Sequence, residues 1–155
     1  MKHFLGIEVK QWTGGIFIGQ RRYAGEVLAR FGMEDSNAVK NPIVPSTKLH
    51  KDEGGVRVDD TLFKQVVGSL MYLTVTRPDL MFCVSLISRF RASPTMTHWL
   101  AAKRILRYVK GTINLGIFYR KGESNLKLVA FTDSDYAGDL DDRRSTSGFV
   151  FKLGA

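Results

Sequence analysis

Apolar residues recur at helical spacing between residues 60 and 111, and strand-like runs flank this block on both sides. The pattern is clearest at the start of the block, where the intervals are three and four residues: Leu62, Phe63, Val66, Val67, Leu70 and Met71. Such intervals place apolar side chains on one face of a helix. Together with the strand-like runs, they predict an α+β fold.

Pro78 divides the helical block. The first helix has a candidate N-cap at Asp59 or Asp60, and it should end near Arg77, because the residue before a proline disfavours helical geometry. Proline suits the first turn of a helix, so Pro78 predicts a second helix that runs to about Phe90.

Ser93 and Pro94 predict the cap and first turn of a third helix, which Gly111 closes. At about 100° per residue, its apolar residues fall on one side, which we expect to face the core. Its cations gather on another side, which we expect to face water or phosphate. The apolar residues are Ala102, Ile105, Leu106 and Val109, and the cations are Lys103, Arg104, Arg107 and Lys110.

Strand patterns and one short helix make up the rest of the predicted structure. The segment from Phe4 to Gly19 alternates and turns through Thr13-Gly14-Gly15, which predicts a hairpin. A short helix should cover Tyr23 to Phe31 and end at Gly32. Residues 34–59 lack periodicity and predict an extended, partly flexible connector. Three later runs are strand-like: Leu115 to Arg120, Leu126 to Thr132 and Gly148 to Leu153.

The positive charge is concentrated in the first two thirds of the chain. The formal net charge is +8, with 17 basic and 9 acidic residues up to position 110 and 6 of each after it. Such a balance is typical of a polyanion-binding protein, although a merely soluble basic protein also has it. No window approaches the about 20 apolar residues that span a bilayer, so no membrane partner is expected. The single cysteine, Cys83, lies in an apolar run and indicates a reducing, intracellular compartment: cytoplasm, nucleus or an organelle.

The acidic segment from Phe131 to Asp142 is the most suggestive of chemistry. It fits an EF-hand calcium loop poorly, because Ala137 and Arg144 stand where carboxylate ligands are needed. It could instead form part of a two-metal nuclease site, although one strand and its loop cannot hold two ions from several directions. A solvated acidic loop, balanced by Arg143 and Arg144, is the remaining alternative.

Five segments, in register over nearly the whole chain, resemble the Pol polyprotein of copia-type LTR retrotransposons. They are FLGIEV (Phe4 to Val9), IFIGQRRYAGEVLARFGM (Ile16 to Met33), VGSLMYLTVTRPDL (Val67 to Leu80), HWLAAKRILRYVKGT (His98 to Thr112) and LKLVAFTDSDYAGDLDDRRSTSGFVFKLG (Leu126 to Gly154). In that family such segments run from the end of the reverse transcriptase into the start of its ribonuclease H.

The resemblance implies a division into four parts. Residues 1–33 correspond to a primer-grip-like hairpin and first thumb-like helix, 34–59 to a connector, 60–111 to a helical thumb/connection-like region, and 112–155 to truncated ribonuclease H-like strands. Asp133 matches the first metal-binding carboxylate of ribonuclease H, and the roles of Asp135 and Asp139 stay open. The family's other catalytic carboxylates have no counterpart here, so we expect no complete catalytic site.

The resulting expectation is a chain that derives from an RNA-directed DNA polymerase/ribonuclease H but is inactive alone. Lys103, Arg104, Arg107 and Lys110 are the candidate phosphate contacts, and the expected partner is an RNA-DNA or other nucleic-acid duplex. No cofactor is expected in isolation, whereas the parent family uses Mg²⁺. The rest of the polyprotein is another possible partner. The alternative function is a host-recruited protein-interaction module, which would bind through an exposed sheet edge.

Three residues of the predicted third helix, which carries the four cations, have two possible roles each. His98 has no ligand-spaced Cys or His and favours a core position over a metal site. Trp99 and Tyr108 could stack on bases, but aromatic residues at helix flanks more often pack against neighbouring elements.

Overall fold

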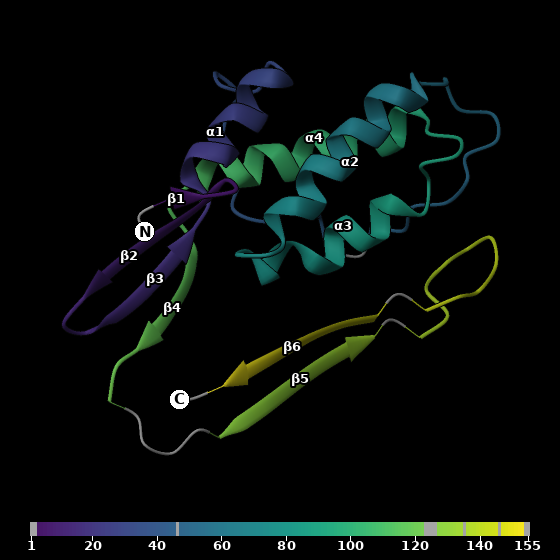
Figure 1. Ribbon diagram of the computed structural model, residues 1–155. Helices are drawn as coiled ribbons and strands as arrows, with labels where there is room; N and C mark the ends of the chain where they lie inside the picture. Colours follow the sequence, from purple (N-terminus) through teal and green to yellow (C-terminus); the bar gives the residue numbers. More distant parts are fainter. Residues whose placement is uncertain (1–2, 46, 123–126, 135, 146, 154–155) are drawn as a thin grey trace.

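The computed structural model describes residues 3–45, 47–122, 127–134, 136–145 and 147–153, and it has the predicted α+β fold (Figure 1). The first part contains β1 (His3–Phe4), β2 (Ile7–Trp12), β3 (Gly15–Gly19) and α1 (Arg21–Arg30). The helical part contains α2 (Asp60–Leu73), the 3-10 turn η1 (Pro78–Leu80), α3 (Met81–Ser88) and α4 (Met96–Gly111). It is followed by β4 (Gly116–Arg120), β5 (Leu128–Ser134) and β6 (Ser147–Leu153).

The N-terminal sheet has the antiparallel order β1-β2-β3-β4. The predicted hairpin is confirmed: β2 pairs with β3, and Trp12 lies opposite Gly15 across the turn. The fourth strand comes from far along the chain, because Gly15 also pairs with Arg120 of β4. The division of the chain that the sequence suggested placed this strand in the part 112–155, whereas in the structure it belongs to the first sheet. Local patterns carry no information on strand partners that distant.

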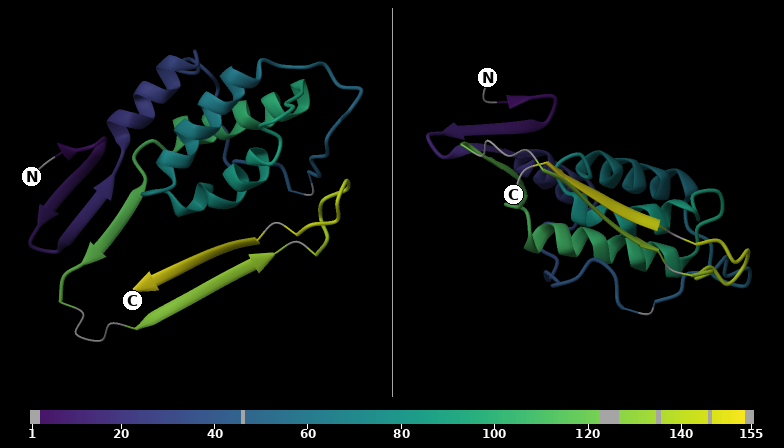
Figure 2. Two further views of the ribbon diagram at one scale, coloured as in Figure 1. Left: turned by 45° about the vertical axis from the view of Figure 1, so that its right-hand side comes forward. Right: turned by 90° about the horizontal axis from the view of Figure 1, so that it is seen from below.

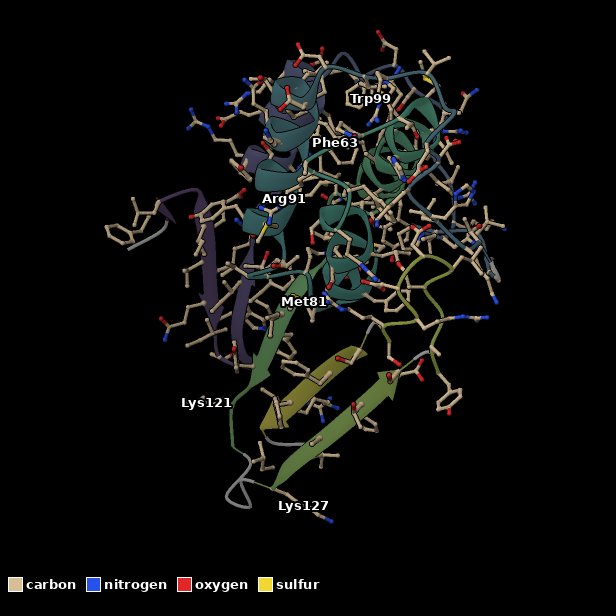
Figure 3. The ribbon with its side chains drawn as sticks, turned by 90° about the vertical axis from the view of Figure 1, so that its right-hand side faces the viewer. Phe63, Met81, Arg91, Trp99, Lys121 and Lys127 are labelled. Atoms are coloured by element: carbon tan, nitrogen blue, oxygen red, sulfur yellow. The ribbon has the colours of Figure 1, made fainter. Side chains whose placement is uncertain are left out.

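Helices α1 to α4 share one apolar core. Gly32 has φ +63° and ends the first helix as predicted. The predicted core face of α4 is confirmed, since Ala102, Ile105, Leu106 and Val109 are fully buried. Phe63 of α2 lies among the helices in Figure 3. The other large, fully buried apolar side chains are Val27, Val66, Val67, Leu70, Leu73, Leu80 and Ile87.

The first long helix begins where the sequence predicts and ends a turn early. The Asp59 side chain is its N-cap and accepts hydrogen bonds from the backbone N–H groups of Thr61 and Leu62, at 2.8 and 3.2 Å. The helix ends at Leu73, and hydrogen-bonded turns continue the chain to Arg77. Pro78 then starts η1, so the predicted second helix consists of a 3-10 turn followed by α3.

The predicted cap of the third helix is wrong. Neither Ser93 nor Pro94 begins it; the N-cap is Thr95, and Met96 is the first helical residue. The reason is long-range pairing, because the Pro94 carbonyl accepts a hydrogen bond from Val58 N–H at 3.1 Å, in an isolated bridge between Arg57 and Thr95. The bridge keeps the chain extended at Thr95, and the helix starts only after this residue.

The hairpin of β5 and β6 forms a second sheet, separate from the first (Figures 1 and 2). Leu128 pairs with Leu153 at one end and Ser134 with Ser147 at the other. Lys121 directly follows β4, the last strand of the first sheet, and Lys127 directly precedes β5 of the second sheet (Figure 3). The predicted start at Leu126 lies outside the described residues. In the part of the chain that the structure describes, no helix has both the length and the apolarity to cross a bilayer.

Candidate nucleic-acid interface

The four predicted phosphate contacts lie on α4 outside the face that its buried residues form. All four side chains are partly buried rather than fully exposed. The Lys103 ammonium lies 5.4 Å from the centre of the Trp99 ring, a cation–π distance. Trp99 itself packs against the core. The helix therefore brings the four cations together, and each of them is half-buried.

The covering segment is the connector. Arg104 Nη2 donates a hydrogen bond to the side-chain oxygen of Asn41, and Arg107 Nε donates to the backbone carbonyl of Asn37 at 2.6 Å. The Nε atom of Arg104 is buried and makes no hydrogen bond among the described residues. The connector is thus bound to α4 through both arginines, whereas the sequence predicted a partly flexible segment. The arginines have a structural role that the helical wheel did not reveal.

The C-terminal end of α4 is held by Arg77, a residue that the sequence analysis did not single out. Its guanidinium is buried and donates to the Thr112 carbonyl at 2.9 Å and to the Thr112 hydroxyl at 2.8 Å. The same guanidinium donates to both carboxylate oxygens of Asp79, at 2.9 and 2.7 Å. The available signal was the TRPDL string, where a charged pair interrupts an apolar run.

Tyr108 completes this group of polar residues. Its hydroxyl donates to Asp79 Oδ2 at 2.9 Å, and its ring lies 5.6 Å from the Arg77 guanidinium carbon. Partial burial opposes the ionisation of Asp79, but the hydrogen bonds and charge of Arg77 outweigh it and hold the pKa of this carboxyl below its usual value. Burial raises the pKa of the Tyr108 hydroxyl, and its bond to Asp79 raises it further. Tyr108 therefore packs within the protein instead of facing outward for stacking.

His98 is a core residue at the other end of α4, as the sequence predicts. Its ring is fully buried and stacks on Phe90 with the centroids 4.0 Å apart. Nδ1 accepts the N–H of Thr95 at 3.0 Å, so Nε2 carries the proton and donates to the His50 carbonyl at 2.8 Å. Burial lowers the pKa of His98 below its usual value. The imidazole therefore caps the helix and binds the connector.

Asp133 lies near the end of β5, as expected, and lines a cleft of about 180 Å³ between the hairpin and the start of α3. Met81 lies on the side of α3 that faces this hairpin (Figure 3). Asp133 Oδ1 accepts the N–H of Ser134 at 2.9 Å. Among the described residues no group of three or more His, Cys, Asp or Glu side chains could hold a metal ion. These residues do not fit a two-metal site, and Asp135 lies outside the described residues.

The acidic loop between β5 and β6 is tied to the helices. Asp139 is buried, and its Oδ1 accepts the N–H groups of Asp141 and Asp142 at 2.7 and 2.9 Å. Its Oδ2 lies 2.6 Å from Arg89 Nη2 at the end of α3. Burial opposes the charge of Asp139, but these N–H groups and Arg89 hold its pKa below the usual value. Of the predicted balancing cations, Arg144 lies 3.3 Å from Asp142. No local sequence pattern indicated the role of Arg89.

Comparison with known proteins shows three close relatives from Arabidopsis thaliana. The chain is 46% identical to the retrovirus-related Pol polyprotein from transposon RE1, over 99% of this chain and 10% of that protein. It is 44% identical to the corresponding polyprotein from transposon RE2, with the same coverage. An uncharacterized mitochondrial protein is 40% identical over 98% of this chain and 62% of its own length.

The chain therefore spans 10% of the length of the two polyproteins. A tobacco relative has the same description, a retrovirus-related Pol polyprotein from transposon TNT 1-94, and is 37% identical over 97% of this chain. No family model and no solved structure matches.

Proposed function

Because this chain belongs to the retrovirus-related Pol polyproteins of copia-type transposons, we propose that it binds a nucleic-acid duplex as the thumb- and connection-like part of a reverse transcriptase that leads into a ribonuclease H. One observation carries the proposal: α4 holds four half-buried cations on one side, while its apolar side is fully buried in the core. A rigid row of cations on a fixed helix is suited to the regular phosphates of a duplex.

The contact proposed is with the sugar-phosphate backbone and not with bases. Lysine and arginine bind phosphate through charge and N–H donors, and such contacts position a protein without reading sequence. Arg104 and Arg107 each donate a hydrogen bond to the connector, and a guanidinium has five N–H donors. Apart from the buried Nε of Arg104, donors remain on both guanidinium groups for the proposed contact with phosphate. The bonds to Asn41 and Asn37 hold both side chains in one position, which lowers the entropic cost of binding.

The salt dependence of binding to an RNA-DNA duplex tests this proposal. Affinity should fall steeply with salt, and charge reversal at Lys103 and Lys110 should weaken binding and reduce the slope of log K against log salt by roughly 0.9 for each lost phosphate contact. Lysines are preferred to Arg104 and Arg107 here, since reversing either arginine also breaks a bond to the connector. Lys64→Glu, on the exposed side of α2, is the matched control. If affinity and slope are unchanged in the α4 variants, these cations do not contact phosphate and the proposal is wrong.

We propose that the described residues have no catalytic site of their own and that Asp133 is one carboxylate of the ribonuclease H-like part. Its cleft is lined mainly by apolar groups, and Asp133 is the only carboxylate among the described lining residues. Further carboxylates would have to come from elsewhere in a larger polyprotein to hold Mg²⁺. Metal-dependent cleavage of an RNA-DNA hybrid by this chain, lost on Asp133→Asn, would contradict the proposal.

A second candidate is protein binding through the β5-β6 hairpin. Its outward face carries exposed apolar side chains, and in the described part of the chain β5 and β6 pair only with each other. Open strand edges and exposed apolar side chains are typical of binding surfaces. The apolar residues on this face include Leu128, Phe149 and Phe151. Size-exclusion chromatography separates the two functions, because a defined complex with a protein supports this one and a nucleic-acid-bound monomer supports the first.

A further inference from the structure

The N-terminal sheet has one face on which aromatic rings cover glycines. The strand register places Trp12 opposite Gly15, and it places Phe17 between Lys10 and Phe118. Directly opposed residues in an antiparallel sheet point to the same side. Three aromatic side chains (Trp12, Phe17 and Phe118) therefore share one face with three glycines (Gly15, Gly19 and Gly116).

Each glycine leaves room that a ring occupies. A Cβ atom at Gly15 would lie 2.8 Å from the Phe118 ring, and one at Gly116 would lie 2.7 Å from the Phe17 ring. Gly15 is buried as a result, although it lies next to the turn of the hairpin. Trp12 and Phe118 stack with centroids 5.2 Å apart and planes 9° apart, yet 50% and 46% of their surfaces stay exposed. The sheet thus presents a flat aromatic surface to solvent.

The charge around these rings is mostly positive. Lys10 and Arg120 lie on the same face of the sheet: Lys10 is opposite Phe17, and Arg120 is opposite Gly15, on the other side of this glycine from Trp12. Arg21 and Lys10 line a small cleft of about 60 Å³ next to the Phe17 ring. Glu8 is the acidic residue on this face, and it accepts the backbone N–H of Arg22 at 2.7 Å.

We propose that this aromatic face binds single-stranded nucleic acid, with unpaired bases stacking on Trp12 and Phe118 and with phosphates near Lys10 and Arg120. A flat ring can stack only on a base whose own face is open, and the bases inside a duplex are covered by their neighbours. Aromatic residues bordered by cations are the recurrent device for such ligands. This face is separate from α4, so the inference does not depend on duplex binding there.

The two tryptophans of the chain report the two surfaces separately. Trp12 lies on the aromatic face, and Trp99 lies beside Lys103 on α4. The Trp99→Phe variant leaves Trp12 as the only indole, and Trp12→Phe leaves Trp99. Titration with oligothymidylate should quench Trp12 emission saturably, and oligouridylate in a parallel titration determines whether RNA is bound as well. An RNA-DNA duplex should affect Trp99 more than Trp12.

Substitutions on the two faces of β4 provide the matched comparison. Phe118→Leu removes a stacking ring but keeps apolar cover over Gly15, and it should weaken oligothymidylate binding roughly five-fold or more. Tyr119→Leu changes an equally exposed aromatic residue on the opposite face and should leave binding unchanged. Circular dichroism of both variants shows whether the sheet is retained.

The outcomes separate this inference from the proposed function. If Trp12 emission is unaffected by single strands while Trp99 responds to a duplex, the aromatic face is not a nucleic-acid site and the α4 proposal stands. If Trp12 responds to single strands and Trp99 does not respond to a duplex, the aromatic face is a nucleic-acid site and the α4 proposal is wrong. Equal losses for Phe118→Leu and Tyr119→Leu would overturn the assignment to this face. A Trp12 signal that changes with protein concentration in the absence of nucleic acid would indicate self-association instead.

Discussion

The buried guanidinium of Arg77 holds both polar oxygens of Thr112, donating to its carbonyl at 2.9 Å and to its hydroxyl at 2.8 Å. Arg77 lies between α2 and η1, and Thr112 directly follows α4. The contact therefore joins the end of the first long helix to the end of the helix that carries the candidate phosphate contacts. A residue that need not touch nucleic acid thus fixes where those cations lie.

Replacing Arg77 should destabilise the protein strongly. In Arg77→Met, Asp79 and Thr112 lose their guanidinium partner, and we expect the free energy of unfolding to fall by about 2–4 kcal/mol. Arg77→Lys should recover little, because an ammonium cannot reproduce the planar fork that reaches two residues. Urea denaturation measures both. The control is Arg91→Met, an exposed arginine whose loss should change stability by no more than about 0.5 kcal/mol.

The stability of the fold should depend on pH through His98. Burial lowers its folded pKa, so below about pH 6.5 the unfolded chain binds a proton that the folded chain does not. The contribution of neutral His98 is therefore complete above about pH 6.5 and is lost as pH falls from there through the folded pKa. The slope for one proton is at most about 1.4 kcal/mol per pH unit.

The His98→Gln variant isolates this effect. Glutamine at the third helical position can still accept the N–H of the N-cap Thr95, as in a capping box, but it does not titrate. Unfolding free energies measured between pH 7 and 5 should lose their slope in the variant, whatever its overall stability. A slope that persists in His98→Gln would assign the pH dependence to other groups.

Local patterns in the sequence predicted most elements and the buried side of α4 correctly. Ala102, Ile105, Leu106 and Val109 follow from helical periodicity, which requires no knowledge of distant partners. The N-cap at Asp59 and the left-handed Gly32 follow from the preferences of single residues. The family resemblance added the order of the parts, and the relatives bear out the family.

What the sequence missed depends on contacts between distant segments. The start of α4 moved from Ser93 to Thr95 because Pro94 pairs with Val58, which no local rule contains. The pairing of β4 with β3 has the same origin. At the candidate site, helical periodicity placed Arg104 and Arg107 on one side of α4 but could not show that the connector binds both. The roles of these cations in binding and of Asp133 in metal chemistry remain predictions.

The contact between Arg89 and Asp139 should control how firmly the C-terminal hairpin lies on the helices. Asp139→Asn removes the charge, but its remaining oxygen can still accept the N–H groups of Asp141 and Asp142, so the loop keeps its local shape. We expect faster hydrogen exchange in residues 136–145 and in β5 and β6, with unchanged protection in α4.

Asp142→Asn is the graded control for this prediction. Asp142 also lies 3.0 Å from Arg89, but its side chain is 40% exposed, against 4% for Asp139. Solvent screens the more exposed pair, so its loss should have a smaller effect on exchange. Equal effects of the two substitutions would mean that net charge in the loop matters more than the buried contact.

The same substitution, glycine to alanine, should have opposite effects at two positions. Gly68 lies inside α2, where a Cβ atom would have open space, so Gly68→Ala should raise the free energy of unfolding by about 0.5–1 kcal/mol through helix propensity. At Gly15 a Cβ atom would lie 2.2 Å from the backbone oxygen of Tyr119 and would displace the Phe118 ring. Since backbone cannot move aside without separating β3 from β4, Gly15→Ala should lower the free energy of unfolding by about 1–3 kcal/mol.

Urea denaturation gives both values, and Trp12 fluorescence in the Trp99→Phe background adds a local readout. Displacement of the Phe118 ring must change the surroundings of Trp12, which stacks on it, so Gly15→Ala should alter Trp12 emission in the folded protein while Gly68→Ala leaves it unchanged. If Gly15→Ala leaves the free energy of unfolding unchanged, β4 does not approach β3 closely. The flat aromatic face could not then form as described, because it depends on Gly15 having no side chain.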